Sequence, residues 1–288
     1  MNKAEQQISE TIEVFEQVAA GYDNPSLRFF PFCGDRITMH LQLKRGQKVL
    51  DVATGTGAAL LAAAQMVGPQ GRVQAIDLAE NMLDRAEHNL RMNGLSNADF
   101  HLMDATKLDF KSRYFDAVIC SFGLFFIPDM LGALKEWRRV LKPGGRLIFT
   151  SFSADAFQPQ GKIFRDDIEA SGVTIEDPGW QRLNNEDTCR DILKQAGFNN
   201  IQLLQEQLGY HLNDEKGWWD IVVNSGLRAI FNKLPAEKRA DFQQQHLEKI
   251  AELKTEQGLW LNVEVLFSSA QRPADSDNQS ASAAKPSD

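Results

Sequence analysis

The chain has 288 residues, of which 43% are hydrophobic and 24% charged, and it carries a formal net charge of −8 at pH 7. This length supports an extensive hydrophobic core in one large α/β domain, with or without a sizeable insertion. The acidic balance argues against nucleic acid as the main partner, because binding to a phosphate backbone depends on clustered Lys and Arg.

Cysteine usage and the absence of apolar segments indicate the compartment. Cys33, Cys120 and Cys189 are odd in number and far apart, and they form no Cys-x-x-Cys pair. We therefore expect no disulfide framework, no metal site and a reducing environment. The N-terminus is polar, and no run approaches the roughly 20 consecutive apolar residues of a membrane span. The sequence predicts a cytoplasmic protein without a stable membrane anchor.

The first 45 residues are predicted to form an N-terminal helical flap. Ile8, Ile12, Phe15 and Val18 recur at helical spacing over residues 8–20. An aromatic patch at residues 27–32 leads to a second predicted helix over 35–43. The aromatic content suits a flap that folds onto a larger body, and core packing of a helix pair explains the same pattern.

Residues 46–153 alternate between short apolar runs and amphipathic segments. Strands are predicted at 49–53, 73–77, 98–102, 115–120 and 146–152, and helices at 58–67, 80–93 and 131–141. The near-continuous apolarity of residues 115–120 indicates a strand buried on both faces. Strands separated by helices predict a doubly wound, mostly parallel sheet of the Rossmann-like α/β type.

Residues 154–271 are predicted to complete this sheet and to carry a helical substrate lid. Residues 154–184 show no clear period, whereas a helix is predicted at 185–196 and a strand at 201–208. Residues 214–225 and 235–257 are predicted to be helical, which gives a lid over about 212–257. The alternating run 259–267 predicts a seventh strand, inserted antiparallel between the two strands before it. Residues 272–288 are predicted to be a disordered tail.

A glycine turn follows the first strand of the sheet. The segment from Val49 to Gly57 places glycines at 55 and 57 between a strand and a helix, where a ligand can approach the backbone closely. In an open α/β sheet the ligand lies outside the carboxyl ends of the strands. The side chains that directly follow the strands are the candidates for this site: Thr54, Gly55, Thr56, Gly57, Asp77, Asp104, Ala105 and Ser121.

These residue types suit an adenine nucleoside. An ionised carboxylate offers only acceptors, so Asp77 can accept two ribose hydroxyls and Asp104 an exocyclic amine. A lone Asp after a strand is more often a helix cap or turn residue, and a lone Gly-x-Gly pair is a weak signal. A nicotinamide cofactor remains an alternative, although the Gly-x-Gly-x-x-Gly pattern is incomplete because Leu60 follows Ala58 and Ala59.

As a set, the motifs resemble those of class I S-adenosylmethionine-dependent methyltransferases, most closely the ubiquinone/menaquinone-biosynthesis type and its small-molecule relatives. The motifs are Val49 to Gly57, Asp77 with residues 78–82, the Asp104–Ala105 pair, the Phe115–Asp116 strand start and residues 141–145. The resemblance covers about residues 20–152. It implies that Thr54 to Gly57 line the methionine part of the cofactor and that Asp77 holds the ribose hydroxyls.

The resemblance also implies roles for residues on the adenine side. Leu78 and Met82 would pack on the adenine, Asp104 would meet its amino group, and Ser121 would lie near the methyl group. Tyr22 falls where the family often has a Tyr-Asp pair that closes over the cofactor. Ala53 stands where the family's fullest pattern has glycine, which is a mild steric departure. The implied cofactor-binding set is Tyr22, Ala53, Thr54, Gly55, Thr56, Gly57, Asp77, Leu78, Met82, Asp104, Ala105 and Ser121.

Methyl transfer from a sulfonium needs mainly alignment of the reactants and exclusion of water, because the leaving group is already activated. A general base is needed only if the nucleophile must lose a proton, and His211 is the candidate, with a packing role as its alternative. Aromatic residues that flank the core predict a hydrophobic acceptor such as an aromatic, quinone or polyketide metabolite. The predicted substrate wall is Phe30, Phe122, Phe126, Phe152, Trp180, Tyr210 and Trp218.

Two other functions stay open on the sequence. A nucleoside-binding module without catalysis would carry the same strand-end residues, and a nicotinamide-dependent oxidoreductase would share the fold. We expect a small-molecule substrate and no nucleic acid or metal. The sequence does not decide whether the protein is a homodimer.

Overall fold

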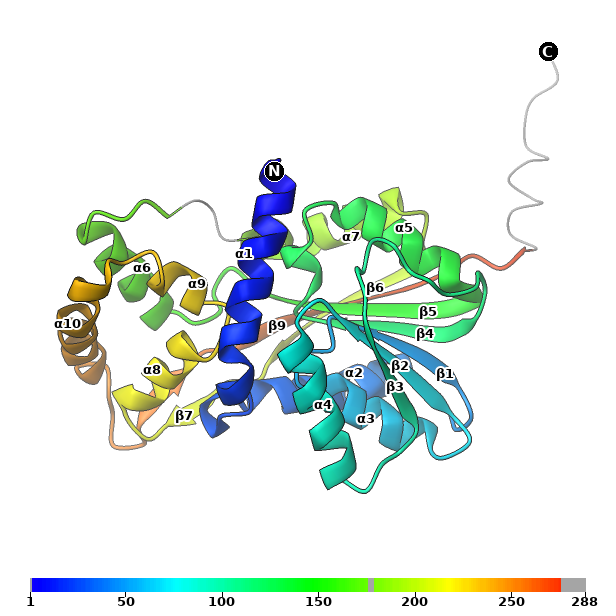
Figure 1. Cartoon of the computed structure of the whole chain (residues 1–288), viewed down its shortest axis with the longest axis horizontal. Helices are drawn as coiled ribbons and strands as arrows, with labels where there is room; N and C mark the ends of the chain where they lie inside the picture. Colours follow the sequence, from blue (N-terminus) through cyan, green and yellow to red (C-terminus); the bar gives the residue numbers. More distant parts are fainter. Residues whose placement is uncertain (1, 176–178, 276–288) are drawn as a thin grey trace, which may run out of the picture.

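A seven-stranded sheet lies at the centre of the fold, with the strand order β3-β2-β1-β4-β5-β9-β6. The computed structural model describes residues 2–175 and 179–275 of the chain (Figure 1). The strands are β1 (Lys48–Val52), β2 (Arg72–Asp77), β3 (Ala98–Leu102), β4 (Phe115–Ser121), β5 (Leu141–Phe152), β6 (Asn199–Gln207) and β9 (Glu264–Gln271). Strands β1 to β5 pair in parallel, and β9 runs antiparallel between β5 and β6. The predicted doubly wound sheet with an antiparallel last strand is confirmed.

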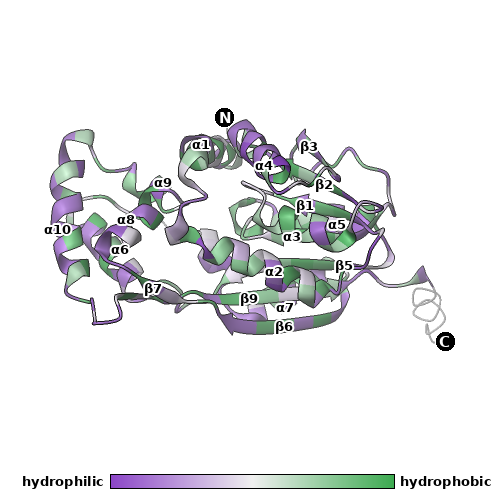
Figure 2. Ribbon diagram, turned by 90° about the horizontal axis from the view of Figure 1, so that it is seen from below, coloured by the Kyte–Doolittle hydropathy of each residue, from purple (hydrophilic) through white to green (hydrophobic). Residues whose placement is uncertain are grey.

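Helices cover both faces of this sheet, as Figure 1 shows. Helices α2, α3 and α4 pack together with the strands on one face, and α5 and α7 pack on the other. Their bounds are α2 (Phe29–Leu41), α3 (Ala58–Val67), α4 (Glu80–Met92), α5 (Met130–Val140) and α7 (Glu186–Gln195). Figure 2 shows α3 as mostly hydrophobic, in keeping with its alanine- and leucine-rich sequence beneath the sheet.

The remaining helices build a lid beyond one end of the sheet (Figure 1). The lid contains α6 (Gln160–Ala170), α8 (Glu215–Val223), α9 (Arg228–Phe231) and α10 (Arg239–Ala251). A small antiparallel sheet of β7 (Tyr210–Leu212) and β8 (Leu259–Leu261) joins the lid to the main sheet. Helix α6 packs against α10 although it comes from residues 154–184, where the sequence predicted no regular element.

The predicted strand at 259–267 is two strands in the structure. Residues 259–261 pair with β7, and residues from Glu264 onward pair with β5 and β6. Between them Asn262 donates from Nδ2 to the Asp155 carbonyl at 2.7 Å and accepts from Gln207 at 2.5 Å. Leu259, Leu261, Val263 and Val265 are all buried. The alternation of buried side chains therefore continues across the break, which hides the change of sheet from the sequence.

Helix α1 (Lys3–Val18) and residues 272–275 flank the sheet-forming part of the chain. Helix α1 lies beside α4 and α9 in Figure 1. Of the predicted tail, the structure describes residues 272–275, where Arg272 donates to three carbonyls, including that of Leu141 at 2.7 Å. The rest of that prediction lies outside the described residues. In the described part of the chain, no helix has both the length and the apolarity to cross a membrane.

Candidate functional site

A largely apolar cavity lies at the carboxyl ends of β1 to β4. The structure brings most of the predicted cofactor-binding residues to its walls: Tyr22, Ala53, Gly55, Asp77, Leu78, Asp104, Ala105 and Ser121. These side chains meet because parallel strands end at the same edge of a sheet. Residues that lie dozens of positions apart in the sequence are therefore neighbours in space.

The other predicted cofactor residues lie behind the cavity wall and support it. Thr54 donates from Oγ1 to Asp51 at 2.6 Å, and the Thr56 carbonyl accepts from Asn89 at 3.0 Å. Gly57 directly precedes α3 with φ 93°, and Met82 is buried in a small apolar cluster with Val18 and Ala79. Thr54, Thr56, Gly57 and Met82 are not among the lining residues.

Asp77 is the best-connected carboxylate of the site. Its Oδ2 accepts from the Gly55 amide at 2.9 Å, and its Oδ1 accepts from the amides of Leu78 and Ala79 at 2.8 and 3.0 Å. Burial raises the pKa of this carboxyl, while the three amides oppose the shift. Each carboxylate oxygen has two lone pairs, so Oδ2 retains acceptor capacity toward the cavity.

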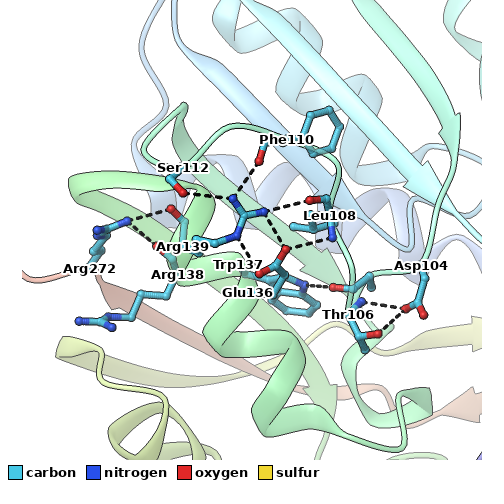
Figure 3. A network of polar contacts seen from close by, with 11 residues as sticks. Asp104, Thr106, Leu108, Phe110, Ser112, Glu136, Trp137, Arg138, Arg139 and Arg272 are labelled. Carbon is cyan, nitrogen blue, oxygen red and sulfur yellow. Dashed lines mark hydrogen bonds and ion pairs between the residues drawn. The ribbon is translucent and has the colours of Figure 1, made fainter.

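Asp104 belongs to a loop that α5 holds in place (Figure 3). Its Oδ1 accepts from the amide and the hydroxyl of Thr106, both at 2.8 Å, as Figure 3 shows, and its second oxygen has no hydrogen-bond partner among the described residues. Trp137 donates from Nε1 to the Ala105 carbonyl at 2.9 Å, and Arg139 donates to the carbonyls of Leu108 and Phe110. The loop is therefore fixed before any ligand arrives.

Asp51 is a buried polar residue next to the glycine turn that sequence reasoning missed, although it does not line the cavity. It lies within β1, is 1% exposed, and its Oδ1 has no partner among the described residues. Burial raises the pKa of this carboxyl to about 7, and the nearby charge of Asp77 contributes. A charged residue inside the otherwise apolar run 49–52 was the available signal, because such a residue is costly unless it has a task.

Two non-glycine residues at the cavity adopt left-handed backbone conformations. Ala53 has φ 52° and Phe122 has φ 54°, at the ends of β1 and β4. The Ala53 methyl group packs against Gly123, where an added Cβ would lie 2.6 Å from it. The alanine at 53 is thus more than a mild steric departure, because a left-handed non-glycine residue carries about 1 kcal/mol or more of strain.

Four of the seven residues of the predicted substrate wall lie at or next to the cavity. Phe122 and Phe126 line the cavity. Phe152 stacks on Phe122 with ring centroids 4.3 Å apart, and Phe30 stacks on Tyr22 at 4.7 Å. These rings form one connected aromatic surface at the cavity.

The structure places the other predicted wall residues elsewhere. Trp180 lies in a 3-10 turn against the main core, and Tyr210 donates from its hydroxyl to the Ser26 carbonyl at 2.7 Å. Trp218 is fully buried in the lid and donates from Nε1 to His246 at 2.9 Å. None of Trp180, Tyr210 and Trp218 lines the cavity, because each packs within the core, the small sheet or the lid instead.

His211, the predicted general base, also lies outside the cavity. It belongs to β7, and its ring packs against Trp260 with centroids 5.0 Å apart. Among the described residues, the titratable side chains that line the cavity are Tyr22, Asp77 and Asp104. The structure therefore gives no geometric support to His211 as a base.

Arg182 is a second residue that the sequence did not single out. Its guanidinium donates to the carbonyls of Phe125, Ile127 and Pro128 at 2.6, 2.8 and 3.3 Å. Phe126, Ile127 and Pro128 line the cavity. Arg182 thus fixes one wall of the site from behind.

The parallel sheet with its antiparallel last strand and the strand-end cavity define a class I methyltransferase of the Rossmann-like type. Residues 1–166, more than half of the chain, match the ubiE/COQ5 methyltransferase family. The chain belongs to this family, and it is a methyltransferase. The predicted resemblance is confirmed, and the nicotinamide-dependent alternative is set aside.

Named relatives and solved structures agree with this assignment. The chain is 38% identical over 147 residues to the aklanonic acid methyltransferase DauC of a Streptomyces strain, which covers 50% of this chain and 67% of the relative. It is 38% identical over 217 residues to the ubiquinone/menaquinone biosynthesis C-methyltransferase UbiE of Yersinia enterocolitica, covering 68% and 86%. A SAM-dependent methyltransferase structure from Aquifex aeolicus has a TM-score of 0.50 at 26% identity, covering 64% and 88%.

Proposed function

We propose that the protein binds S-adenosylmethionine in the strand-end cavity and transfers its methyl group to a hydrophobic small molecule of the aromatic, quinone or polyketide type. The observation that carries this proposal is one continuous cavity with carboxylates on one side and apolar rings on another. The carboxylates are Asp77 and Asp104, and the apolar wall includes Phe15, Phe122 and Phe126.

The residues present fit this cofactor. Asp77 has free acceptor capacity for ribose hydroxyls, and the second oxygen of Asp104 is available to an amine. Gly55 has no side chain between its backbone and the Tyr22 ring, which an added Cβ would approach to 3.7 Å. The backbone of the turn is therefore open to a ligand in the cavity.

The acceptor class follows from the apolar wall. Small-molecule sites are mostly apolar with a few placed polar groups, and the surface of Phe30, Phe122, Phe126 and Phe152 has this character. The two named relatives act, by their names, on aklanonic acid and in ubiquinone/menaquinone biosynthesis. Both associations support a hydrophobic acceptor for this chain.

When bound, the cofactor supplies an activated methyl group on a sulfonium. The protein's own residues orient the two reactants and exclude water. Asp77 and Asp104 would fix the nucleoside, Ser121 and Phe122 would face the transfer path, and Arg182 would keep the Phe126 wall in position. An acceptor held in line would take the methyl group directly, without a protein-bound intermediate, so the effect of the protein is largely alignment.

Calorimetric titration with S-adenosylhomocysteine and with NAD tests the cofactor. We expect S-adenosylhomocysteine to bind and NAD to show no heat above dilution, and the reverse result overturns the proposal. Incubation with S-adenosylmethionine and a panel of hydrophobic quinones, phenols and polyketides, followed by mass spectrometry, tests the acceptor. A product 14 mass units heavier is expected, and methylation confined to hydrophilic acceptors would contradict the proposed class.

A further inference from the structure

Helix α1 is attached to the protein differently from the other helices that border the cavity. Among the described residues, the main hydrophobic core includes no side chain of α1. The C-terminal end of α1 instead contributes Val18 to a separate small cluster with Ala79 and Met82. An element with few core contacts belongs to the least stable part of a fold.

The apolar face of α1 points into the cavity. Ile8, Thr11, Ile12 and Phe15 all line it, and the Phe15 ring contacts the Phe126 ring across it at 5.1 Å. In most amphipathic helices this face would be buried against protein. Here the space beneath it is the ligand site, so a bound ligand would supply the missing apolar contacts.

Hydrogen bonds of Glu16 attach the C-terminal end of α1 to the start of α4. The carboxylate of Glu16 accepts from the amides of Glu80 and Asn81 at 2.5 and 3.2 Å, and Asn81 donates from its side chain to the Glu16 carbonyl at 3.3 Å. Ala79, the residue that precedes α4, has no side chain able to cap this helix. Glu16 therefore caps α4 from another helix, with the charge that a helix N-terminus favours.

Asp77 binds backbone amides directly beside those that Glu16 binds at the start of α4. Asp77 takes the amides of Leu78 and Ala79, and Glu16 takes the next two amides along the chain. The Glu16 charge also contributes to the raised pKa of Asp77. Glu16, which attaches α1, and Asp77, the proposed cofactor contact, thus accept hydrogen bonds from four consecutive backbone amides. Figure 1 shows α1 beside α4 at this point.

We propose that Glu16 is a positioning residue that fastens α1 over the cavity, so that closure of α1 and occupancy of the site stabilise each other. A second hydrogen bond, from Asn232 of α9 to Gln17 at 2.9 Å, attaches α1 to the lid. Closure of α1 completes the apolar wall of Ile8, Ile12 and Phe15. This inference rests on the proposed function only for the identity of the ligand, which is S-adenosylmethionine or its demethylated product S-adenosylhomocysteine.

The test compares Glu16→Ala, Glu16→Gln and the wild type, with Glu13→Gln as matched control. Glu13 is an exposed glutamate on the same helix, so its substitution removes the same charge without touching α4. Calorimetry and stopped-flow displacement give the affinity and dissociation rate of S-adenosylhomocysteine. Hydrogen exchange reports on the amides of residues 8–18 with and without the ligand.

We expect S-adenosylhomocysteine to protect the α1 amides in the wild type and in Glu13→Gln. Glu16→Ala should bind about fivefold more weakly, mainly through faster dissociation, since a lost cap costs about 1 kcal/mol. Glu16→Gln, whose amide oxygen still accepts, should recover part of this loss. A merely structural role would lower the melting temperature and leave the dissociation rate unchanged.

Two outcomes overturn the inference. One is equal affinity and equal dissociation rate in Glu16→Ala and wild type. The other is full protection of the α1 amides without ligand, which would make α1 a fixed wall. Absence of binding to the wild type itself is a different result, because it contradicts the proposed cofactor and not the role of Glu16.

Discussion

A buried hydrogen-bond network in the lid and the buried carboxyl of Asp51 at the cofactor end of the sheet differ in how their polar groups are satisfied. In the lid, Trp218 donates to His246 Nε2, and His246 Nδ1 faces Asp167 at 2.8 Å, with Lys249 paired to the same carboxylate. The indole is only a donor, so Nε2 must be the unprotonated nitrogen and Nδ1 must donate. At the cofactor end, Asp51 keeps an oxygen without a partner in the described structure.

This difference separates a closed hydrogen-bond network from a buried carboxyl with one open oxygen. A buried polar group without a partner costs free energy that a closed network avoids. Sequence reasoning assigned Trp218 to the substrate wall and overlooked Asp51. The structure changes both assignments: Trp218 stabilises the lid, and Asp51 lies beneath the site.

The largest expected effect comes from Trp218→Ala. Trp218 is fully buried, so its truncation should lower the free energy of unfolding by about 3–5 kcal/mol. Because Trp218 does not line the cavity, affinity for S-adenosylhomocysteine should stay within about twofold. Denaturant unfolding and calorimetry measure the two quantities. Trp260→Ala, at an indole that is 41% exposed, is the control. A large loss of affinity in Trp218→Ala would show that the lid network belongs to the site after all.

The second prediction concerns pH at the cofactor end. Asp51 has a pKa of about 7 in the folded protein and about 4 when unfolded, so its stabilising effect is complete below pH 4 and is lost as pH rises to 7. Asp51→Asn removes this titration. The variant should gain stability relative to the wild type between pH 5 and 7, by on the order of 3 kcal/mol. A difference that does not change with pH would contradict the buried, unpaired state of Asp51.

His246 in the lid provides the contrast to this pH dependence. Burial lowers its pKa, although Asp167 opposes the shift. The neutral imidazole is therefore favoured in the folded state, and its contribution to stability is lost as pH falls below about 6.5. The two regions thus depend on pH in opposite directions.

A smaller effect is expected for Asp77. Asp77→Ala should weaken binding of S-adenosylhomocysteine by about 1–3 kcal/mol, the cost of a lost charged hydrogen-bond partner. Asp77→Asn keeps the shape and one acceptor oxygen, so it should lose less. Calorimetry measures both, together with a thermal scan to confirm folding. Unchanged affinity in Asp77→Ala would remove this residue from the site.

The smallest effect is expected for Ala53→Gly. Glycine relieves the left-handed strain at φ 52°, but it also increases the freedom of the unfolded chain and removes the methyl contact with Gly123. These terms oppose one another, so the change in unfolding free energy should stay within about 0.5 kcal/mol. Ala53→Val serves as the control, because a β-branched residue tolerates this backbone conformation poorly and should destabilise clearly. Equal stability of the valine variant would contradict the strain at residue 53.

The sequence by itself determined the sheet, its helices and the strand ends that form the cavity. These features depend on local rules: apolar period, glycine turns, and the fact that parallel strands end at one edge. Tyr22, Gly55, Asp77, Asp104 and Ser121 line the cavity, and each follows such a rule or a family motif.

Only the tertiary structure decided which aromatic and polar residues face the cavity. Trp218 and Phe122 are both aromatic residues near polar neighbours in sequence, but one is enclosed by α8 and α10 and the other lies beside Ser121. The role of Glu16 likewise depends on α1 meeting α4, a contact between residues 64 positions apart. Long-range packing sets such contacts, and the local period of a sequence carries no record of them.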